Sequence, residues 1–248
     1  MKSDINSVAY GEEWSALWEQ DYGTRPDTDD AVRTVADLAA GRPVLELGVG
    51  TGRLAVPLAD LGLPVHGVDN SPWMLAGLRK KPGGERVTTT EGDLVTTTVP
   101  GRFGVVLLAS YALFALTTQE QQIDCFRNAA AHLEPGGAFV VEVVSPQLLE
   151  ADICRPVKIS ADEVVLLVST AADRITQRLQ TAHVYLRHDA PVKILPWDSR
   201  YAGPPEMDLM GRLAGLELSA RWGGWDRRPY TAASAKHISV YTLPEGPV

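Results

Sequence analysis

Cysteine is scarce in this chain of 248 residues, where only Cys125 and Cys154 occur. These two positions have neither the spacing of a metal-binding motif nor that of a disulfide framework, and the five histidines are scattered. We therefore expect no metal site. The lack of a disulfide pattern, together with first residues that are polar rather than apolar, indicates a reducing cytoplasm.

Positive charge and long apolar runs are lacking as well. The formal net charge is −8, whereas a protein that binds nucleic acid needs a basic face to release counterions from phosphates. No apolar run is long enough to span a membrane. With 45% hydrophobic residues, the chain can fill the core of a single domain over residues 1–248. We expect a small-molecule substrate and no nucleic-acid or membrane partner, and we leave a homodimer open.

Three glycines stand close together in the run VLELGVGTGR over residues 44–53. An apolar strand there breaks into three alternating glycines, which permit a tight turn and expose backbone N–H groups to a nucleotide-like ligand. A second expected strand ends at Asp69, whose carboxylate can accept hydrogen bonds from two neighbouring ribose hydroxyls. The pattern predicts a nucleoside site at the ends of two parallel strands.

Two alternatives stay open at this point. Nicotinamide-dependent oxidoreductases also carry an acidic residue at the end of the second strand, but in their fingerprint G-x-G-x-x-G the third glycine stands where this chain has Arg53. The other alternative is a protein that keeps the cofactor fold as a non-catalytic interaction module.

Four segments in order resemble the motifs of class I S-adenosylmethionine-dependent methyltransferases. Glu46 with Gly48, Gly50 and Gly52 matches the first motif, an acidic residue followed by G-x-G-x-G. The run DNSPWML at 69–75 resembles the acidic end of the family's second strand and the adenine-facing residues that follow it. The run EGDL at 91–94 matches the third segment, and residues 103–111 resemble the fourth strand and its exit loop. Within the family, the resemblance is closest to bacterial glycopeptide and amino-sugar N-methyltransferases of natural-product biosynthesis.

This resemblance implies S-adenosylmethionine as the methyl donor and S-adenosylhomocysteine as the product. It also implies the roles of individual residues, with Asp93 accepting from the adenine amino group and the Leu94 N–H reaching a ring nitrogen. The residues expected to bind the cofactor are Tyr22, Glu46, Gly48, Gly50, Gly52, Arg53, Asp69, Asn70, Met74, Asp93, Leu94 and Ala109.

The alternation of short apolar runs with amphipathic segments predicts an α/β fold with a parallel sheet. After residue 146 the pattern changes to long strands, which predicts an antiparallel excursion. The resemblance implies a Rossmann-like class I methyltransferase fold, with a mostly parallel seven-stranded sheet, helices on both faces and an antiparallel β cover inserted after strand five. The expected strands are 44–47, 65–68, 87–90, 105–109, 138–144, 164–170, 175–186, 192–201, 216–222 and 237–243.

We expect four segments within the one domain. They are an N-terminal lid helix at 1–26, a cofactor-binding core at 27–146, a substrate cover at 155–201, and a helix with a strand pair at 202–248.

Methyl transfer from a sulfonium is an in-line displacement, so the acceptor must be held close to the methyl carbon and shielded from water. An amine acceptor needs only to arrive neutral, whereas a hydroxyl needs a general base. We expect an amine of a specialised metabolite or antibiotic precursor, with hydroxyl and thiol left open. The catalytic candidates are Tyr111, Glu142 and His183, and the substrate-binding candidates are Tyr10, Trp14, Trp18, Ser110, Phe114 and Trp197.

Overall fold

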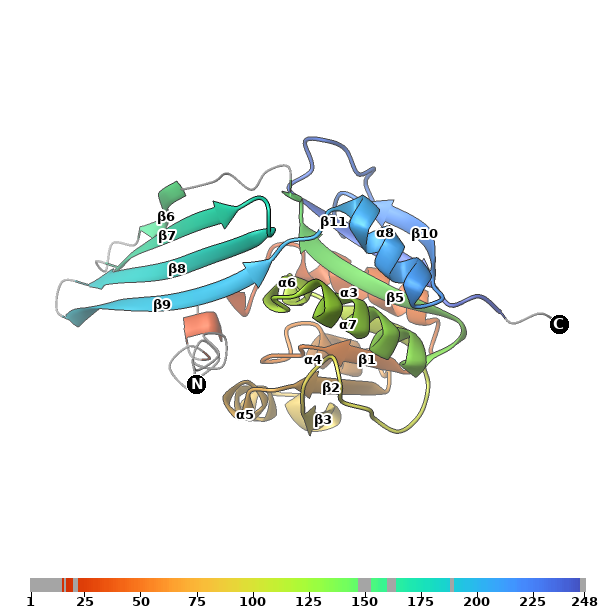
Figure 1. Cartoon of the computed structure of the whole chain (residues 1–248). Coiled ribbons are helices and arrows are strands. Elements are labelled where there is room, and N and C mark those ends of the chain that lie inside the picture. Colours follow the sequence, from red (N-terminus) through yellow and green to blue (C-terminus); the bar gives the residue numbers. More distant parts are fainter. Residues whose placement is uncertain are drawn as a thin grey trace.

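A seven-stranded sheet forms the centre of the computed structural model, which describes residues 15, 17–19, 22–146, 153–159, 164–187 and 190–245 (Figure 1). The strand order is β10-β11-β5-β4-β1-β2-β3, and β11 runs antiparallel to its neighbours. All pairings among β1–β5 are parallel, as the sequence predicts. The strands are β1 (Val44–Leu47), β2 (Val65–Asp69), β3 (Thr88–Glu91), β4 (Phe103–Leu108), β5 (Leu133–Val144), β10 (Glu217–Trp222) and β11 (Lys236–Thr242).

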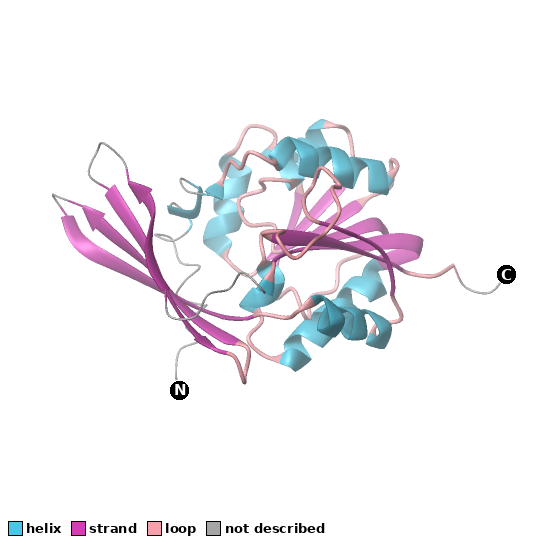
Figure 2. Ribbon diagram, turned by 90° about the horizontal axis from the view of Figure 1, so that it is seen from above, coloured by secondary structure: helices cyan, strands magenta, loops and turns pink. Residues whose placement is uncertain are grey.

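Helices cover both faces of this sheet (Figure 2). Buried residues of β5 alternate between the two sides: Val140 packs in the core beneath α3, α4 and α5, and Phe139 packs in the core beneath α6, α7 and α8. The helices are α3 (Thr28–Ala39), α4 (Ala55–Asp60), α5 (Pro72–Lys80), the short 3₁₀ helix η1 (Gly84–Arg86), α6 (Ala112–Ala115), α7 (Gln119–His132) and α8 (Pro204–Leu213). Among the described helices, none combines the length and the apolar character that a membrane span requires.

Local signals set several of these helix ends. Ser71 caps α5 by accepting a hydrogen bond from the Met74 N–H, and Pro72 occupies the first turn, where its missing N–H leaves no bond unmade. Thr118 and Gln121 form a reciprocal capping box at the start of α7. That helix ends at His132, and Leu133 begins β5, about five residues before the strand start predicted at residue 138.

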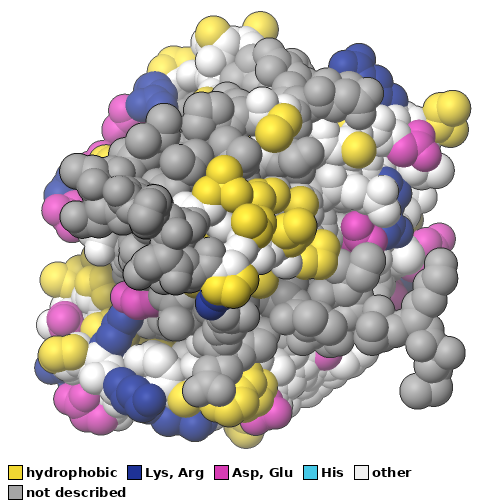
Figure 3. Space-filling model, turned by 90° about the vertical axis from the view of Figure 1, so that its left-hand side faces the viewer, with side chains coloured by type: hydrophobic (Ala, Val, Ile, Leu, Met, Phe, Trp, Pro, Cys, Tyr) yellow, Lys and Arg dark blue, Asp and Glu magenta, His cyan; other side chains and the backbone are white. Residues whose placement is uncertain are grey.

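A second sheet, here called the cover, is antiparallel and has the order β6-β7-β8-β9. Its strands are β6 (Ile153–Ile159), β7 (Val164–Asp173), β8 (Arg178–Arg187) and β9 (Ala190–Arg200). The sequence predicts β7, β8 and β9, whereas β6 was not predicted. On the side of the molecule at the left of Figure 1, hydrophobic side chains gather (Figure 3).

The hairpin between β7 and β8 turns later than predicted, at residues 174–177 rather than 171–174. Asp173 decides this, because its Oδ1 accepts hydrogen bonds from the N–H groups of Ile175 and Thr176 and so closes the turn. Ile175 is predicted to be the first residue of a strand, but it lies at the tip of the hairpin and is 94% exposed.

Candidate active site

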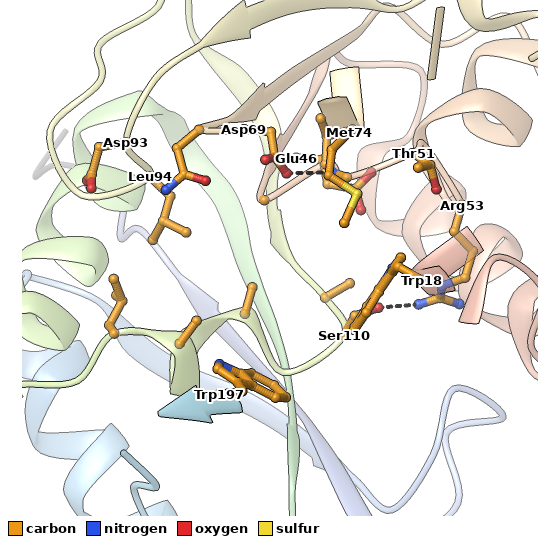
Figure 4. A pocket seen from close by; sticks show the side chains of 18 of the residues that line it. Trp18, Glu46, Thr51, Arg53, Asp69, Met74, Asp93, Leu94, Ser110 and Trp197 are labelled. Atoms are coloured by element: carbon orange, nitrogen blue, oxygen red, sulfur yellow. Dashed lines mark hydrogen bonds between the residues drawn. The ribbon is translucent and has the colours of Figure 1, made fainter. Parts of the chain in front are cut away.

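A pocket lies at the carboxyl ends of β1, β2 and β4, beside α6 and β9 (Figure 4). Its walls include Trp18 from the N-terminal segment and Trp197 from the cover, so segments distant in the sequence meet around it. Figure 4 shows Asp93 and Leu94 at one end of the pocket and Arg53 at the other. The predicted cofactor residues that line it are Glu46, Gly48, Gly50, Arg53, Asp69, Asn70, Met74, Asp93, Leu94 and Ala109.

The glycine loop after β1 is bent tightly, and its three glycines have φ values of 72°, 53° and 78°. Residues other than glycine rarely adopt this left-handed conformation. A Cβ at Gly50 would meet nothing within 4 Å, so the loop leaves open space on this side. A Cβ at Gly52 would lie 2.9 Å from the Leu78 side chain and 3.0 Å from that of Val56, so Gly52 serves the packing of the loop against α5 and α4.

Asp69, at the end of β2, holds the glycine loop in place. Its Oδ2 accepts from the Gly50 N–H at 2.8 Å, and its Oδ1 accepts from the Ser71 N–H at 2.9 Å. Burial raises the pKa of Asp69, and the two backbone N–H groups oppose that rise. Each carboxylate oxygen has a second lone pair, so both can accept a further hydrogen bond from a ligand in the pocket.

Glu46 is a buried acid, and one of its two carboxylate oxygens lacks a hydrogen-bond partner in the described part of the chain. It is 4% exposed, and its Oε2 has no hydrogen-bond partner among the described residues. Burial raises the pKa of Glu46 to about 8, against a smaller opposing effect of Arg53. A cationic or N–H-bearing ligand group would satisfy this oxygen.

The loop after β3 presents Asp93 and Leu94 to the pocket. Asp93 Oδ1 accepts from the Val95 N–H at 2.7 Å and from the Thr96 N–H at 3.3 Å, which curls the loop around its own side chain. From α7, the Asn128 side-chain amide donates to the Leu94 carbonyl at 2.9 Å. The Leu94 position is thus fixed from outside the pocket.

At the opposite end, Arg53 connects the glycine loop to the exit of β4. Its Nη2 donates to Ser110 Oγ at 3.2 Å and lies 3.6 Å from Glu142 Oε2, and its side chain is 9% exposed. Ser110 and Tyr111 both have left-handed backbone conformations, with φ values of 53° and 65°. Two consecutive residues of this kind indicate a loop held in place by its surroundings.

Glu142 holds the loop of Ser110 and Tyr111 in place from behind the pocket wall. The carboxylate is fully buried, and it accepts from the Ser110 N–H at 2.9 Å, from Trp225 Nε1 at 3.1 Å and from Lys236 Nζ at 2.6 Å. Burial would raise the pKa of Glu142, but Lys236 and Arg53 outweigh it and keep the pKa below its usual value. The predicted catalytic acid therefore faces other protein groups and is ionised.

Tyr22, Tyr111 and His183 lie together beside the pocket. Tyr22 Oη is 3.4 Å from His183 Nε2 on β8, and the Arg25 guanidinium lies over the Tyr22 ring at 5.7 Å and over the Tyr111 ring at 5.5 Å. Tyr22 also packs on Trp18, with ring centroids 4.6 Å apart. This cluster joins the N-terminal segment to the cover and to the β4 exit.

The remaining substrate candidates differ in their surroundings. Ser110, Trp18 and Trp197 line the pocket, whereas Phe114 is 3% exposed and packs in the core with α7. Tyr10 and Trp14 lie outside the described residues. Among the residues that the structure describes, no group of histidine, cysteine or acidic side chains could hold a metal ion.

Several residues of the pocket wall were not predicted from the sequence, because α6 has only four residues and begins after the left-handed residue Tyr111. The apolar spacing of Ala112, Ala115 and Leu116 is the signal that could have identified this part of the pocket wall. Thr51 was missed too, although its hydroxyl donates to Glu19 and thereby ties the N-terminal segment to the glycine loop. The missed lining residues are Val49, Thr51, Ala112, Ala115, Leu116, Thr117 and Gln121.

Comparison with known proteins agrees with this geometry. A family model described as a methyltransferase domain matches residues 44–137. The cypemycin N-terminal methyltransferase of a Streptomyces species is 33% identical over 207 residues, which cover 81% of this chain and 82% of that protein. The CcbJ methyltransferase of Streptomyces caelestis is 40% identical, with a TM-score of 0.89 over 95% of this chain and 98% of that one.

A more distant relative shows the same fold. CalS10 from Micromonospora echinaspora, an amino pentose methyltransferase involved in calicheamicin biosynthesis, was solved with S-adenosylmethionine bound. It is 20% identical, with a TM-score of 0.74 over 92% of this chain and 94% of that one. The nicotinamide alternative is therefore wrong, and this chain belongs to the class I S-adenosylmethionine-dependent methyltransferases.

Proposed function

We propose that this enzyme methylates an amine of a small specialised metabolite or antibiotic precursor. The supporting observation is that the acidic and the uncharged side chains of the pocket come from different elements. The acidic side chains Glu46, Asp69 and Asp93 stand at the ends of β1 and β2 and after β3, whereas the lining side chains from α6, the start of α7, the segment between them and β9 are uncharged. These uncharged lining residues, here called the uncharged wall, are Ala112, Ala115, Leu116, Thr117, Gln121 and Trp197.

An uncharged wall suits an amine better than a hydroxyl. A hydroxyl acceptor needs a general base within hydrogen-bond reach, and the described residues of that wall include no carboxylate or histidine. A neutral amine carries its own lone pair and needs only orientation and the exclusion of water. The indole rings of Trp18 and Trp197 would provide the exclusion.

The carboxylate side of the pocket fits S-adenosylmethionine. In this proposal Asp69 accepts from the ribose hydroxyls, Asp93 and the Leu94 N–H bind the adenine, and Met74 packs against its ring. Glu46 suits the methionyl ammonium, because its Oε2 is buried without a partner in the described part of the chain. When bound, the cofactor supplies an electrophilic methyl group on a sulfonium.

Arg53 and Tyr22 are proposed at the methionyl carboxylate. Arg53 lines the pocket and is a buried cation, and Tyr22 lies against Trp18 at the same end. Glu142 and Ser110 then act as positioning residues, because Glu142 holds the loop that carries Ser110.

The names of the relatives support an amine in natural-product chemistry. One relative is an N-terminal methyltransferase of cypemycin, and one structural neighbour acts on an amino pentose. We therefore favour amino sugars and amino-terminal peptide amines as acceptors.

The test is methyl transfer from isotope-labelled S-adenosylmethionine to matched pairs of compounds, such as an amino sugar and the sugar with a hydroxyl at the same carbon. We expect label in the amine and a rate that rises with pH as the amine loses its proton. Faster labelling of the hydroxyl or thiol partner would contradict the amine assignment. Tight binding of S-adenosylhomocysteine with no transfer to any acceptor would favour the interaction module.

A further inference from the structure

Two consecutive residues of the uncharged wall are held by side chains from behind. Leu116 and Thr117 follow α6 and line the pocket. Gln122 Nε2 donates to the Leu116 carbonyl at 3.2 Å, and Arg178 Nη1 of β8 donates to the Thr117 carbonyl at 3.1 Å. The wall therefore takes its position from a layer that does not itself touch the pocket.

Gln122 is the centre of that layer. It is 0% exposed, and besides Leu116 its Nε2 donates to the carbonyls of Leu113 at 3.2 Å and Arg200 at 2.8 Å. Its Oε1 accepts from Arg200 Nη1 at 2.7 Å. The reversed amide would bring its oxygen against three carbonyl oxygens, so only one orientation satisfies the site.

Arg200 carries the layer into the cover. It is 7% exposed at the end of β9, and its Nη2 donates to Gln177 Oε1 and Glu206 Oε1, both at 2.6 Å. Glu206 stands in the first turn of α8, where a negative charge is favoured. The buried guanidinium is thus neutralised and bonded in several directions, which makes its position well defined.

The same strand presents Trp197 to the pocket, three residues before Arg200. Between them, Asp198 Oδ2 lies 3.2 Å from Arg178 Nη2, so the Thr117 contact also leads back to β9. Strand β9 and helix α6 are in direct contact. The two sides of the wall, Trp197 and residues 116–117, are therefore joined by Gln122, Arg178 and Arg200.

We propose that Gln122 is a positioning residue for the methyl acceptor: by joining the Leu116 carbonyl to Arg200, it sets the spacing between residues 116–117 and Trp197, and hence the acceptor shape that the pocket admits. This inference rests on the proposed function for the identity of the acceptor, although the geometry itself does not. Loss of the amide would take a donor from three buried carbonyls and an acceptor from Arg200 Nη1, so we expect the wall to shift.

The test compares three variants in protein labelled with 5-fluorotryptophan. Gln122→Glu keeps an acceptor for Arg200 and loses the donor to the carbonyls, and Gln122→Met loses both. Phe126→Leu, on the same helix α7 and buried in the core, is the control for general loss of stability. The ¹⁹F resonance of Trp197 is assigned by its absence in Trp197→Phe.

We expect the Trp197 resonance to shift or split in both Gln122 variants and to stay in place in Phe126→Leu, with S-adenosylhomocysteine affinity within about twofold of the wild type in all three. For the best amine acceptor, KM should rise by about tenfold or more in the Gln122 variants, with a smaller change in kcat.

An unchanged Trp197 resonance in the Gln122 variants, or an equal shift in Phe126→Leu, would overturn the proposal. Should Gln122→Met fail to fold, Gln122→Glu and Arg200→Lys decide the matter. Because the ¹⁹F spectrum needs no acceptor, a failure of the amine assignment leaves this readout intact.

Discussion

Glu142 Oε2 accepts a hydrogen bond from the Ser110 backbone N–H at 2.9 Å, and this bond ties the end of β5 to the loop that leaves β4. Lys236, which starts β11, binds the same carboxylate and also pairs with Asp27 before α3. One buried acid thus organises four segments of chain beneath the cofactor pocket, without lining the pocket itself.

Replacing Glu142 by glutamine should destabilise the fold. The amide NH2 would face either Trp225 Nε1 and Lys236 Nζ or the Ser110 N–H and Arg53, all of which are donors, and the two buried cations would lose the compensating charge. We expect a loss of about 3–5 kcal/mol in the free energy of unfolding, measured in urea. The matched control is Glu134→Gln on the same strand, whose half-exposed pair with Arg42 at 3.9 Å should contribute about 0.5 kcal/mol or less. Equal losses in the two variants would contradict this account.

Glu46 should make folding stability depend on pH. Its folded pKa, about 8, lies above the ordinary value of 4.5, so the folded protein keeps a proton that the unfolded chain releases between these values. This contribution to stability is complete below pH 4.5 and is lost as pH rises to about 8. Glu46→Gln cannot ionise, so relative to the wild type it should be more stable at pH 8.5 by up to about 4 kcal/mol and nearly equal at pH 4.5. Urea unfolding at the two pH values measures this, and parallel pH profiles would refute it.

Asp69→Asn should weaken cofactor binding. An NH2 group in place of one carboxylate oxygen cannot accept, so the bond from either the Gly50 N–H or the Ser71 N–H is lost together with an acceptor for a ribose hydroxyl, and the charge that strengthens the remaining bonds is removed. The expected loss is about 1.5–3 kcal/mol in S-adenosylhomocysteine binding by calorimetry. Asp60→Asn, at the exposed end of α4 where Asp60 pairs with Arg86, is the control and should bind normally. Unchanged affinity in Asp69→Asn would remove Asp69 from the ribose site.

Two glycines of one loop should fail in different ways. Gly50→Ala forces a left-handed alanine into open space beside the pocket, at a cost of about 1–2 kcal/mol, and its methyl group should also weaken S-adenosylhomocysteine binding. Gly52→Ala adds a clash with Leu78 and Val56, so a further 1–3 kcal/mol or so of stability should be lost. Thermal unfolding and calorimetry on both variants separate the effects. A Gly50→Ala protein that is the less stable of the two would speak against this division of roles.

The short-range features of this protein could be predicted from its sequence. Alternating glycines require a left-handed loop, Ser71 and Pro72 start a helix, and apolar runs at βαβ spacing build a parallel sheet. Each depends on the conformational preferences of a few neighbouring residues. The parallel sheet and the acidic residue at the end of β2 followed from these features, whereas the seven strands and the role of Asp93 were implied by the family resemblance.

Partners that meet only after folding could not be predicted. Trp225 reaches Glu142 across 83 residues, and Arg200 reaches Gln122 across 78. The pattern around Glu142 indicated an acid at a strand end, but only burial between Lys236 and Arg53 shows that it faces away from the pocket. The fold and the cofactor loop were thus determined by the sequence itself, because they arise from local geometry. The charge state of Glu46, the packing role of Gly52 and the spacing of Trp197 were decided by the tertiary structure, because burial and long-range hydrogen bonds exist only once the layers have packed.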